Sequence, residues 1–118
     1  MAYVDAYVLA VPKDKLNEYK TFSESMLHFW TDEGCTSYVE CVGDDVPKGE
    51  TTSFPRAVQA TDDEVVVFGW AVWPDKATRD AANAKMMQAP PPQGPMPFDC
   101  KRMFYGGFRP LIERGKGA

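Results

Sequence analysis

The stretch 65-VVVFGWAVW-73 gives the strongest strand signal in this chain of 118 residues. Small and bulky side chains alternate along it with a period of two, which is typical of a β-strand with both faces covered. The bulky side carries Val66, Phe68, Trp70 and Val72, and the small side carries Val65, Val67, Gly69 and Ala71. We expect a helix to pack closely against the small side.

Three further segments are predicted to complete a sheet. Residues 3–11 alternate in the same way, residues 35–46 predict a second strand, and residues 101–109 predict the last one. Residues 56–60 are compatible with a short additional strand. The proline-rich segment 89–97 forbids both helix and central strand, so we expect an ordered or gating loop there.

Two segments predict helices. Apolar residues recur at steps of three and four between residues 13 and 33, with Gly34 placed as a C-terminal cap. Residues 75–88 predict a second helix, in which Asp75 is the N-cap and the alanines permit close approach to a sheet.

The resulting order of elements predicts an α+β, ferredoxin-like βαββαβ fold in one domain, residues 1–118, with an antiparallel four-stranded sheet and two helices on one face. The uncovered face is then expected to be too apolar for water. It is expected to carry Tyr7, Leu9, Tyr38, Val42, Phe68, Trp70 and Val72. We therefore predict a homodimer, a dimeric α/β barrel, whose two sheets enclose an aromatic-lined cavity.

Four segments carry a resemblance to a known family: 3-YVDAYVLAVP-12, 38-YVECVGDDVPKGETTSFPRAV-58, 79-RDAANAKMM-87 and 96-MPFDCKRMFYGGF-108. Together they resemble the YbaA-like family of small bacterial proteins of unknown function, in the dimeric α/β-barrel superfamily. The resemblance implies the same fold and dimer and brings no established activity. More distant members of the superfamily include cofactor-independent monooxygenases, haem-degrading proteins, lactone isomerases and ligand-sensing domains.

Composition narrows the function classes. The formal net charge is −4, and the 13 basic residues are scattered, so binding to nucleic acid is not expected. No apolar run approaches the roughly 20 residues of a membrane helix, and no secretory signal is recognisable. Three cysteines without a C-x-x-C pair favour reduced thiols, and the single His28 has no ligand-spaced partner. We expect a cytoplasmic protein without a metal site or cofactor.

Asp5 and Glu40 are the candidate catalytic residues, because alternation places both on the bulky sides of their strands. A carboxylate beside tyrosines and a tryptophan in a closed cavity would have a raised pKa, as a general base near neutral pH requires. The alternative is structural: Asp5 and Glu40 pair with Lys101, Arg102 or Arg56 of neighbouring strands.

Candidate ligand-binding residues surround these carboxylates. Tyr hydroxyls are suited to orient a ligand oxygen, and Arg79 or Asn83 would hold an anionic group at the cavity mouth, unless they form only a solvated helix face. The set comprises Tyr7, Tyr38, Trp70, Arg79, Asn83, Lys101 and Tyr105.

Three classes of function fit an aromatic-lined cavity: a cofactor-independent monooxygenase- or isomerase-like enzyme, a sensor or carrier of a small organic molecule, and a structural dimer with a filled core. An enzyme needs an unpaired polar group facing free volume, a carrier needs the volume alone, and a filled core has neither. Alternation along the strands does not separate the three.

Overall fold

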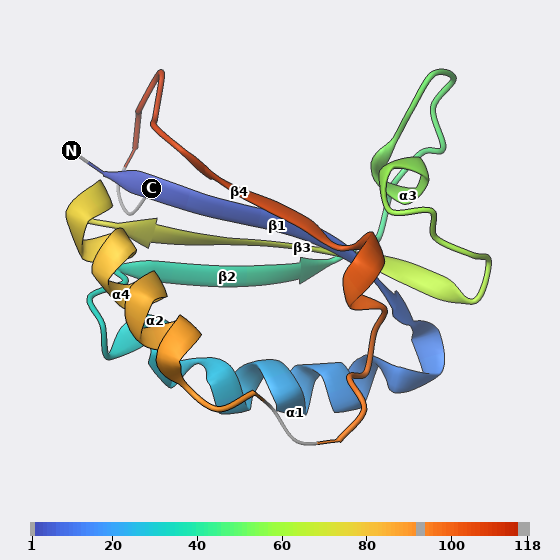
Figure 1. The fold of residues 1–118 in the computed structure, drawn as a ribbon. Helices are drawn as coiled ribbons and strands as arrows, with labels where there is room; N and C mark the ends of the chain where they lie inside the picture. The colour runs from blue at the N-terminus through green and yellow to red at the C-terminus, as the bar shows by residue number, and fades with distance from the viewer. Residues whose placement is uncertain (1, 92–93, 116–118) are drawn as a thin grey trace.

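The fold is a four-stranded antiparallel sheet with helices packed on one face, as Figure 1 shows for a computed structural model that describes residues 2–91 and 94–115. The strands are β1 (Tyr3–Pro12), β2 (Ser37–Val42), β3 (Glu64–Trp73) and β4 (Phe104–Phe108). They lie in the order β2-β3-β1-β4. This is the predicted ferredoxin-like α+β arrangement.

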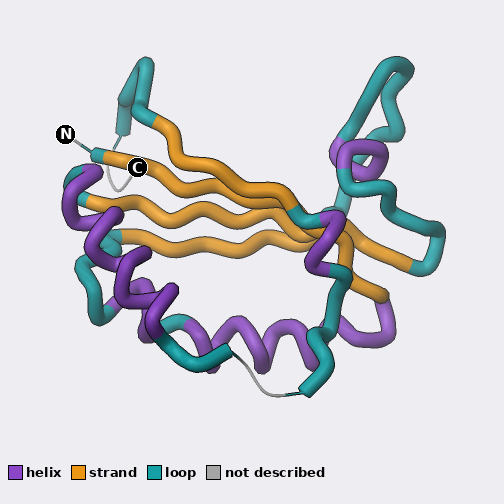
Figure 2. Tube along the Cα trace, viewed as in Figure 1, coloured by secondary structure: helices purple, strands orange, loops and turns teal. Residues whose placement is uncertain are grey.

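The helices of the covered face are η1 (Lys13–Lys15), α1 (Leu16–Met26), α2 (His28–Thr31) and α4 (Lys76–Gln88). All of them lie below the sheet in Figure 2. As predicted, Asp75 caps α4, and its carboxylate accepts a hydrogen bond from the Thr78 amide at 2.7 Å. The single helix expected over residues 13–33 is divided instead, because the Leu27 amide bonds to the carbonyl of Glu24 and tightens the chain there.

Two of the predicted strands differ from the structure: one is absent and one starts later. Residues 56–60 form no strand: α3 (Phe54–Ala57) begins at Ser53, whose hydroxyl accepts from the Arg56 amide, with Pro55 in its first turn. The last strand starts at Phe104 because η2 (Cys100–Arg102) precedes it. The Asp99 carboxylate caps that turn by accepting from the Lys101 amide. Residues 92 and 93 of the proline-rich segment lie outside the described residues.

Strand register decides which side chains face the helices. Tyr7 pairs with Gly69 of β3 and with Tyr105 of β4, and paired residues share a face. The bulky side of β1 therefore lies on the same face as the small side of β3. A Cβ at Gly69 would overlap the Tyr7 ring, so the glycine makes room for the tyrosine.

This register corrects the expected composition of the uncovered face. The alternation predicts that it carries Tyr7, Leu9, Tyr38 and Val42, but these residues lie on the helix-covered face. The bulky residues of β3, which are Phe68, Trp70 and Val72, do lie on the face away from α1 and α4. The prediction was wrong because it placed the bulky side chains of every strand on the same face. In the structure, the bulky side chains of β1 lie on the same face as the small side chains of β3.

The core has three parts. Leu9, Val11 and Tyr19 join β1 to α1, and Ala71, Trp73 and Ala82 join β3 to α4. On the opposite face, the segment around α3 covers one end of the sheet, where Val58 is fully buried. The rest of that face leaves Phe104 and Phe108 about half exposed, at 46% and 58%.

No helix among the described residues is both long and apolar enough to cross a membrane.

Candidate functional site

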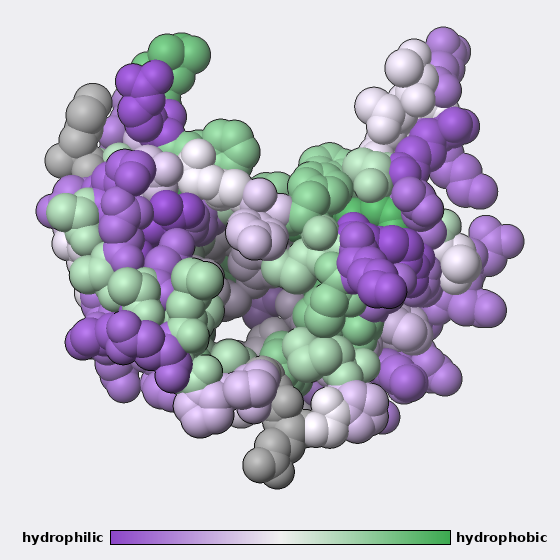
Figure 3. All heavy atoms as spheres, in the orientation of Figure 1, coloured by the Kyte–Doolittle hydropathy of each residue, from purple (hydrophilic) through white to green (hydrophobic). Residues whose placement is uncertain are grey.

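A cavity of about 410 Å³ lies between the sheet and the helices α1 and α4, and we call it the helix–sheet cavity. Figure 3 shows the hollow on this side of the molecule, bordered by apolar side chains. Six of the predicted site residues line it: Asp5, Tyr7, Tyr38, Arg79, Asn83 and Tyr105. The cavity thus belongs to the single chain and lies on the helix side of the sheet, opposite to the face from which a shared barrel cavity was expected.

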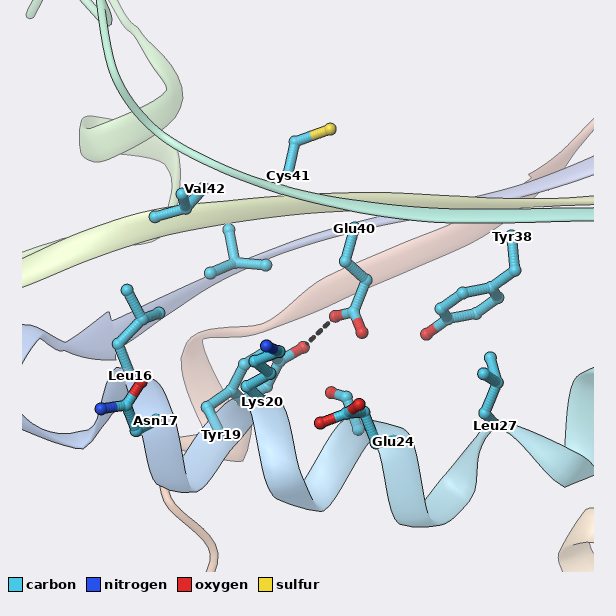
Figure 4. A pocket seen from close by; sticks show the side chains of 12 residues that line it. Leu16, Asn17, Tyr19, Lys20, Glu24, Leu27, Tyr38, Glu40, Cys41 and Val42 are labelled. Atoms are coloured by element: carbon cyan, nitrogen blue, oxygen red, sulfur yellow. Dashed lines mark hydrogen bonds between the residues drawn. The ribbon is translucent and has the colours of Figure 1, made fainter.

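Three of the predicted site residues lie elsewhere. Trp70 is on the other face of the sheet, because it pairs with Ala6 in β1 and not with Tyr7. Lys101 is exposed in η2, outside the expected strand, and does not line the cavity. Glu40 lines a neighbouring groove of about 420 Å³ between α1 and β2, which we call the α1–β2 groove (Figure 4).

Asp5 is held by two side chains from different elements. Arg79 of α4 donates from Nε and a terminal nitrogen at 2.9–3.2 Å, and Trp73 of β3 donates from Nε1 at 3.0 Å. The Asp5 and Arg79 side chains are only 13% and 18% exposed. Asp5 therefore ties α4 to the sheet, and its carboxylate is already occupied.

Arg79 is occupied in the same way. Its remaining terminal nitrogen donates to Asp80 at 3.0 Å, and its guanidinium lies 5.2 Å from the centroid of the Tyr3 ring. Hydrogen bonds from its guanidinium to Asp5 and Asp80 raise the pKa of Arg79, with burial acting against them. Two carboxylates thus balance this cation, which leaves it poorly placed to hold an anionic ligand.

The two arginines expected to pair with the carboxylates in the structural alternative are engaged elsewhere. Arg102 donates to both oxygens of Glu64, at 2.7 and 2.6 Å, and also to Asp99. Arg56 donates to the backbone oxygens of Lys48 and Gly49. Asp5 does form an ion pair, but with Arg79.

A pair of tyrosines forms the polar part of the cavity floor. The hydroxyls of Tyr7 and Tyr38 lie 2.6 Å apart, so one donates to the other. Burial is the first cause of a raised pKa at both groups, and the negative charge of Glu40 adds to it. Both phenols therefore stay protonated at neutral pH and act as hydrogen-bonding groups.

Glu40 sits behind this pair. The Tyr19 hydroxyl of α1 donates to one oxygen of its carboxylate, and Figure 4 shows the Tyr38 hydroxyl pointing toward the same carboxylate. Burial and this hydrogen bond raise the pKa of Tyr19. Tyr19, Ser23 and Tyr38 line both the cavity and the groove, so they form the wall between the two.

Among residues 2–91 and 94–115, no three His, Cys, Asp or Glu side chains are grouped as a metal ion would require.

Comparison with known proteins identifies the family. Residues 2–100 match the family described as "Protein of unknown function (DUF1428)". The chain is 45% identical over 116 residues to the uncharacterised protein YbaA of Escherichia coli K12, covering 96% of this chain and 99% of YbaA. The chain belongs to this family. YbaA of Shigella flexneri matches to the same extent.

A crystal structure of a proposed monooxygenase from Shewanella loihica resembles the chain with a TM-score of 0.49 and 18% identity. The likeness covers 96% of this chain and 99% of that one.

Several cavity residues of this family member are not evident from the sequence. Tyr19, Met26 and Phe98 line the cavity, and Trp73 anchors Asp5. Tyr19 and Met26 lie on the apolar stripe of a predicted helix, a pattern that is equally typical of core residues. One sequence feature does point to the cavity floor: Gly69 is a glycine inside a strand. Such a glycine can mark a position where a large side chain of the neighbouring strand, here Tyr7, lies across it.

Proposed function

We propose that this protein binds a small, ring-containing and largely apolar organic molecule in the helix–sheet cavity. One observation carries the proposal: a volume of about 410 Å³ whose walls are mainly aromatic and methionine side chains. Ligand pockets of proteins typically enclose about 300–1,000 Å³ and combine apolar walls with few polar groups. Here those groups include the Tyr7–Tyr38 pair and Asn83, with Ser23 and Tyr105 also on the lining.

The polar groups support a sensor or carrier over a cofactor-independent monooxygenase- or isomerase-like enzyme. Base catalysis needs a proton acceptor that faces the ligand. Asp5 is taken up by Arg79 and Trp73, and Glu40 lies in the α1–β2 groove behind the tyrosines. The tyrosines hold their protons, so they are suited to orient a ligand. A filled core, the third class, would leave no such volume.

We further propose that the protein works as a cytoplasmic homodimer formed through the uncovered sheet face. Phe104 and Phe108 are half exposed there, and an apolar hollow of about 480 Å³ lies between β4 and α3. An apolar face of this kind is expected to be covered by a second copy.

Free thiols at Cys35, Cys41 and Cys100 support a reducing compartment. The acidic composition supports no nucleic-acid partner.

Binding of indole, followed by isothermal titration calorimetry, tests the cavity proposal. We expect the wild-type chain to bind one indole per chain, and Asn83→Phe to abolish binding because the ring fills the cavity from α4. Ala84→Phe is the matched control, since Ala84 is exposed and one residue further along the same helix. The proposal is wrong if Asn83→Phe binds indole as well as Ala84→Phe does.

A further inference from the structure

We infer that Glu40 fixes the direction of hydrogen bonding across the Tyr38–Tyr7 pair, so that the helix–sheet cavity selects ligands that donate a hydrogen bond. This inference rests on the proposed ligand binding and names the chemical class that the site would take: ring compounds with an N–H or O–H group. Glu40 is then a positioning residue that acts from outside the cavity.

The direction starts at the carboxylate. An ionised carboxylate only accepts hydrogen bonds. One oxygen of Glu40 accepts from the Tyr19 hydroxyl, and the side chain of Tyr38 reaches toward the same carboxylate from the neighbouring wall position (Figure 4). A Tyr38 hydroxyl that donates to Glu40 has used its only proton.

The direction then passes to Tyr7. With the single Tyr38 proton given to Glu40 in this inference, the 2.6 Å contact between the two hydroxyls requires Tyr7 to donate to Tyr38. Tyr7 is left with lone pairs and no free proton. Because Tyr7 lines the helix–sheet cavity, the group that it offers there is an acceptor.

The carboxylate of Glu40 is not shared with a basic side chain in any ion pair of the described residues, so its oxygens are available to the tyrosine hydroxyls. A ligand with a hydrogen to donate would complete the series of hydrogen bonds, whereas a ligand with only an acceptor would face a second acceptor. Leaving a buried acceptor unpaired costs more than a typical hydrogen bond gains.

Indole and benzofuran provide a matched pair of probes, because they have nearly the same shape and differ at one ring position. Indole has an N–H donor there, and benzofuran has an oxygen that can only accept. Isothermal titration calorimetry should show that the wild-type chain binds indole about tenfold more tightly than benzofuran. In Glu40→Gln the preference should fall below about threefold, because a glutamine amide can donate to Tyr38 and reverse the direction.

Two further variants make the test specific. Glu24→Gln removes a carboxylate that also lines the α1–β2 groove but is exposed and makes no hydrogen bond to either tyrosine, so it should keep the preference for indole. Tyr38→Phe breaks the connection between Glu40 and Tyr7 and should lose the preference even if Glu40→Gln folds poorly.

Equal binding of indole and benzofuran by the wild-type chain would overturn this inference and leave the proposed cavity intact. A preference that persists in both Glu40→Gln and Tyr38→Phe would overturn it as well. If the wild-type chain binds neither probe, the proposed ligand binding fails, and the inference fails with it.

Discussion

The Asp5 carboxylate accepts hydrogen bonds from side chains of two different elements, and these bonds determine whether it can act as a base. Arg79 comes from α4 and Trp73 from the end of β3, so the carboxylate joins three segments that are far apart in the sequence. A residue of this kind contributes to stability more than to reactivity, because its lone pairs are already used. The alternative of a free base would need the same carboxylate to face the cavity unpaired.

Asp5→Asn should destabilise the fold by about 1–3 kcal/mol, because the amide cannot balance the Arg79 charge and turns a donor toward a donor. Urea unfolding followed by tryptophan fluorescence measures this change. Lys85→Gln is the control: Lys85 pairs with Glu33 at the surface, with its side chain 66% exposed, and its loss should cost no more than about 1 kcal/mol. Equal effects of the two substitutions would contradict the anchoring role of Asp5.

The ion pair between Glu64 and Arg102 should make the free energy of unfolding depend on pH in the acid range. Hydrogen bonds from Arg102 are the main cause that lowers the pKa of Glu64 from 4.5 to about 2. Because the folded pKa lies below the unfolded one, this stabilisation is complete above pH 4.5 and is lost as the pH falls toward 2.

Wild type and Glu64→Gln should therefore differ most in urea midpoint near neutral pH, and the difference should shrink from pH 4.5 downward and be largely lost below pH 2. Urea titrations of both chains at a series of pH values measure it. A difference that stays constant across this range would show that the carboxylate is not stabilised by its charge.

At the level of elements, alternation and periodicity identified the four strands of the sheet and the two main helical segments, because burial imposes a period of two on strands and near 3.6 on helices. The short α3 was not predicted, since its Ser53 cap and Pro55 lie among turn-forming residues and residues 56–60 are compatible with a short strand. Six of the residues predicted for the site line one cavity. Their face was not predicted correctly, because the face depends on register between strands, and one strand's pattern does not contain it.

The closest packing between β1 and β3 is at Gly69, where the Tyr7 ring occupies the space that a side chain would need. Gly69→Ala should destabilise the fold by about 2 kcal/mol or more and weaken indole binding, because the new methyl group displaces the Tyr7 ring from the cavity floor. Thermal unfolding and calorimetry measure the two effects.

Gly106→Ala is the matched control for this substitution. A Cβ at Gly106 comes no closer than 3.5 Å to Phe108, which is an ordinary contact, and the alanine should be neutral or slightly stabilising. If both alanines are tolerated equally, the close packing of Tyr7 on Gly69 does not determine the register.

At the level of the whole molecule, the two faces of the sheet serve different purposes in our interpretation. The helix side encloses the cavity within one chain, so ligand binding needs no residue from a second copy. The other side carries Phe68 and Trp70 of β3, which are partly buried, and Phe104 and Phe108 of β4, which are about half exposed. Dimerisation and ligand binding should therefore be separable by substitution.

The wild-type chain should sediment at about twice its mass of 13.2 kDa at micromolar concentration, and Phe108→Glu should sediment as a monomer. Phe108 lies on the uncovered face, 58% exposed, and a charge there cannot be buried between two sheets without a partner.

Met87→Glu is the control, because Met87 is 88% exposed on α4, at the other face of the sheet, and its substitution should leave the dimer intact. A monomeric wild-type chain, or equal dissociation of both variants, would rule out this interface. If Phe108→Glu is monomeric and still binds indole, the cavity functions within a single chain.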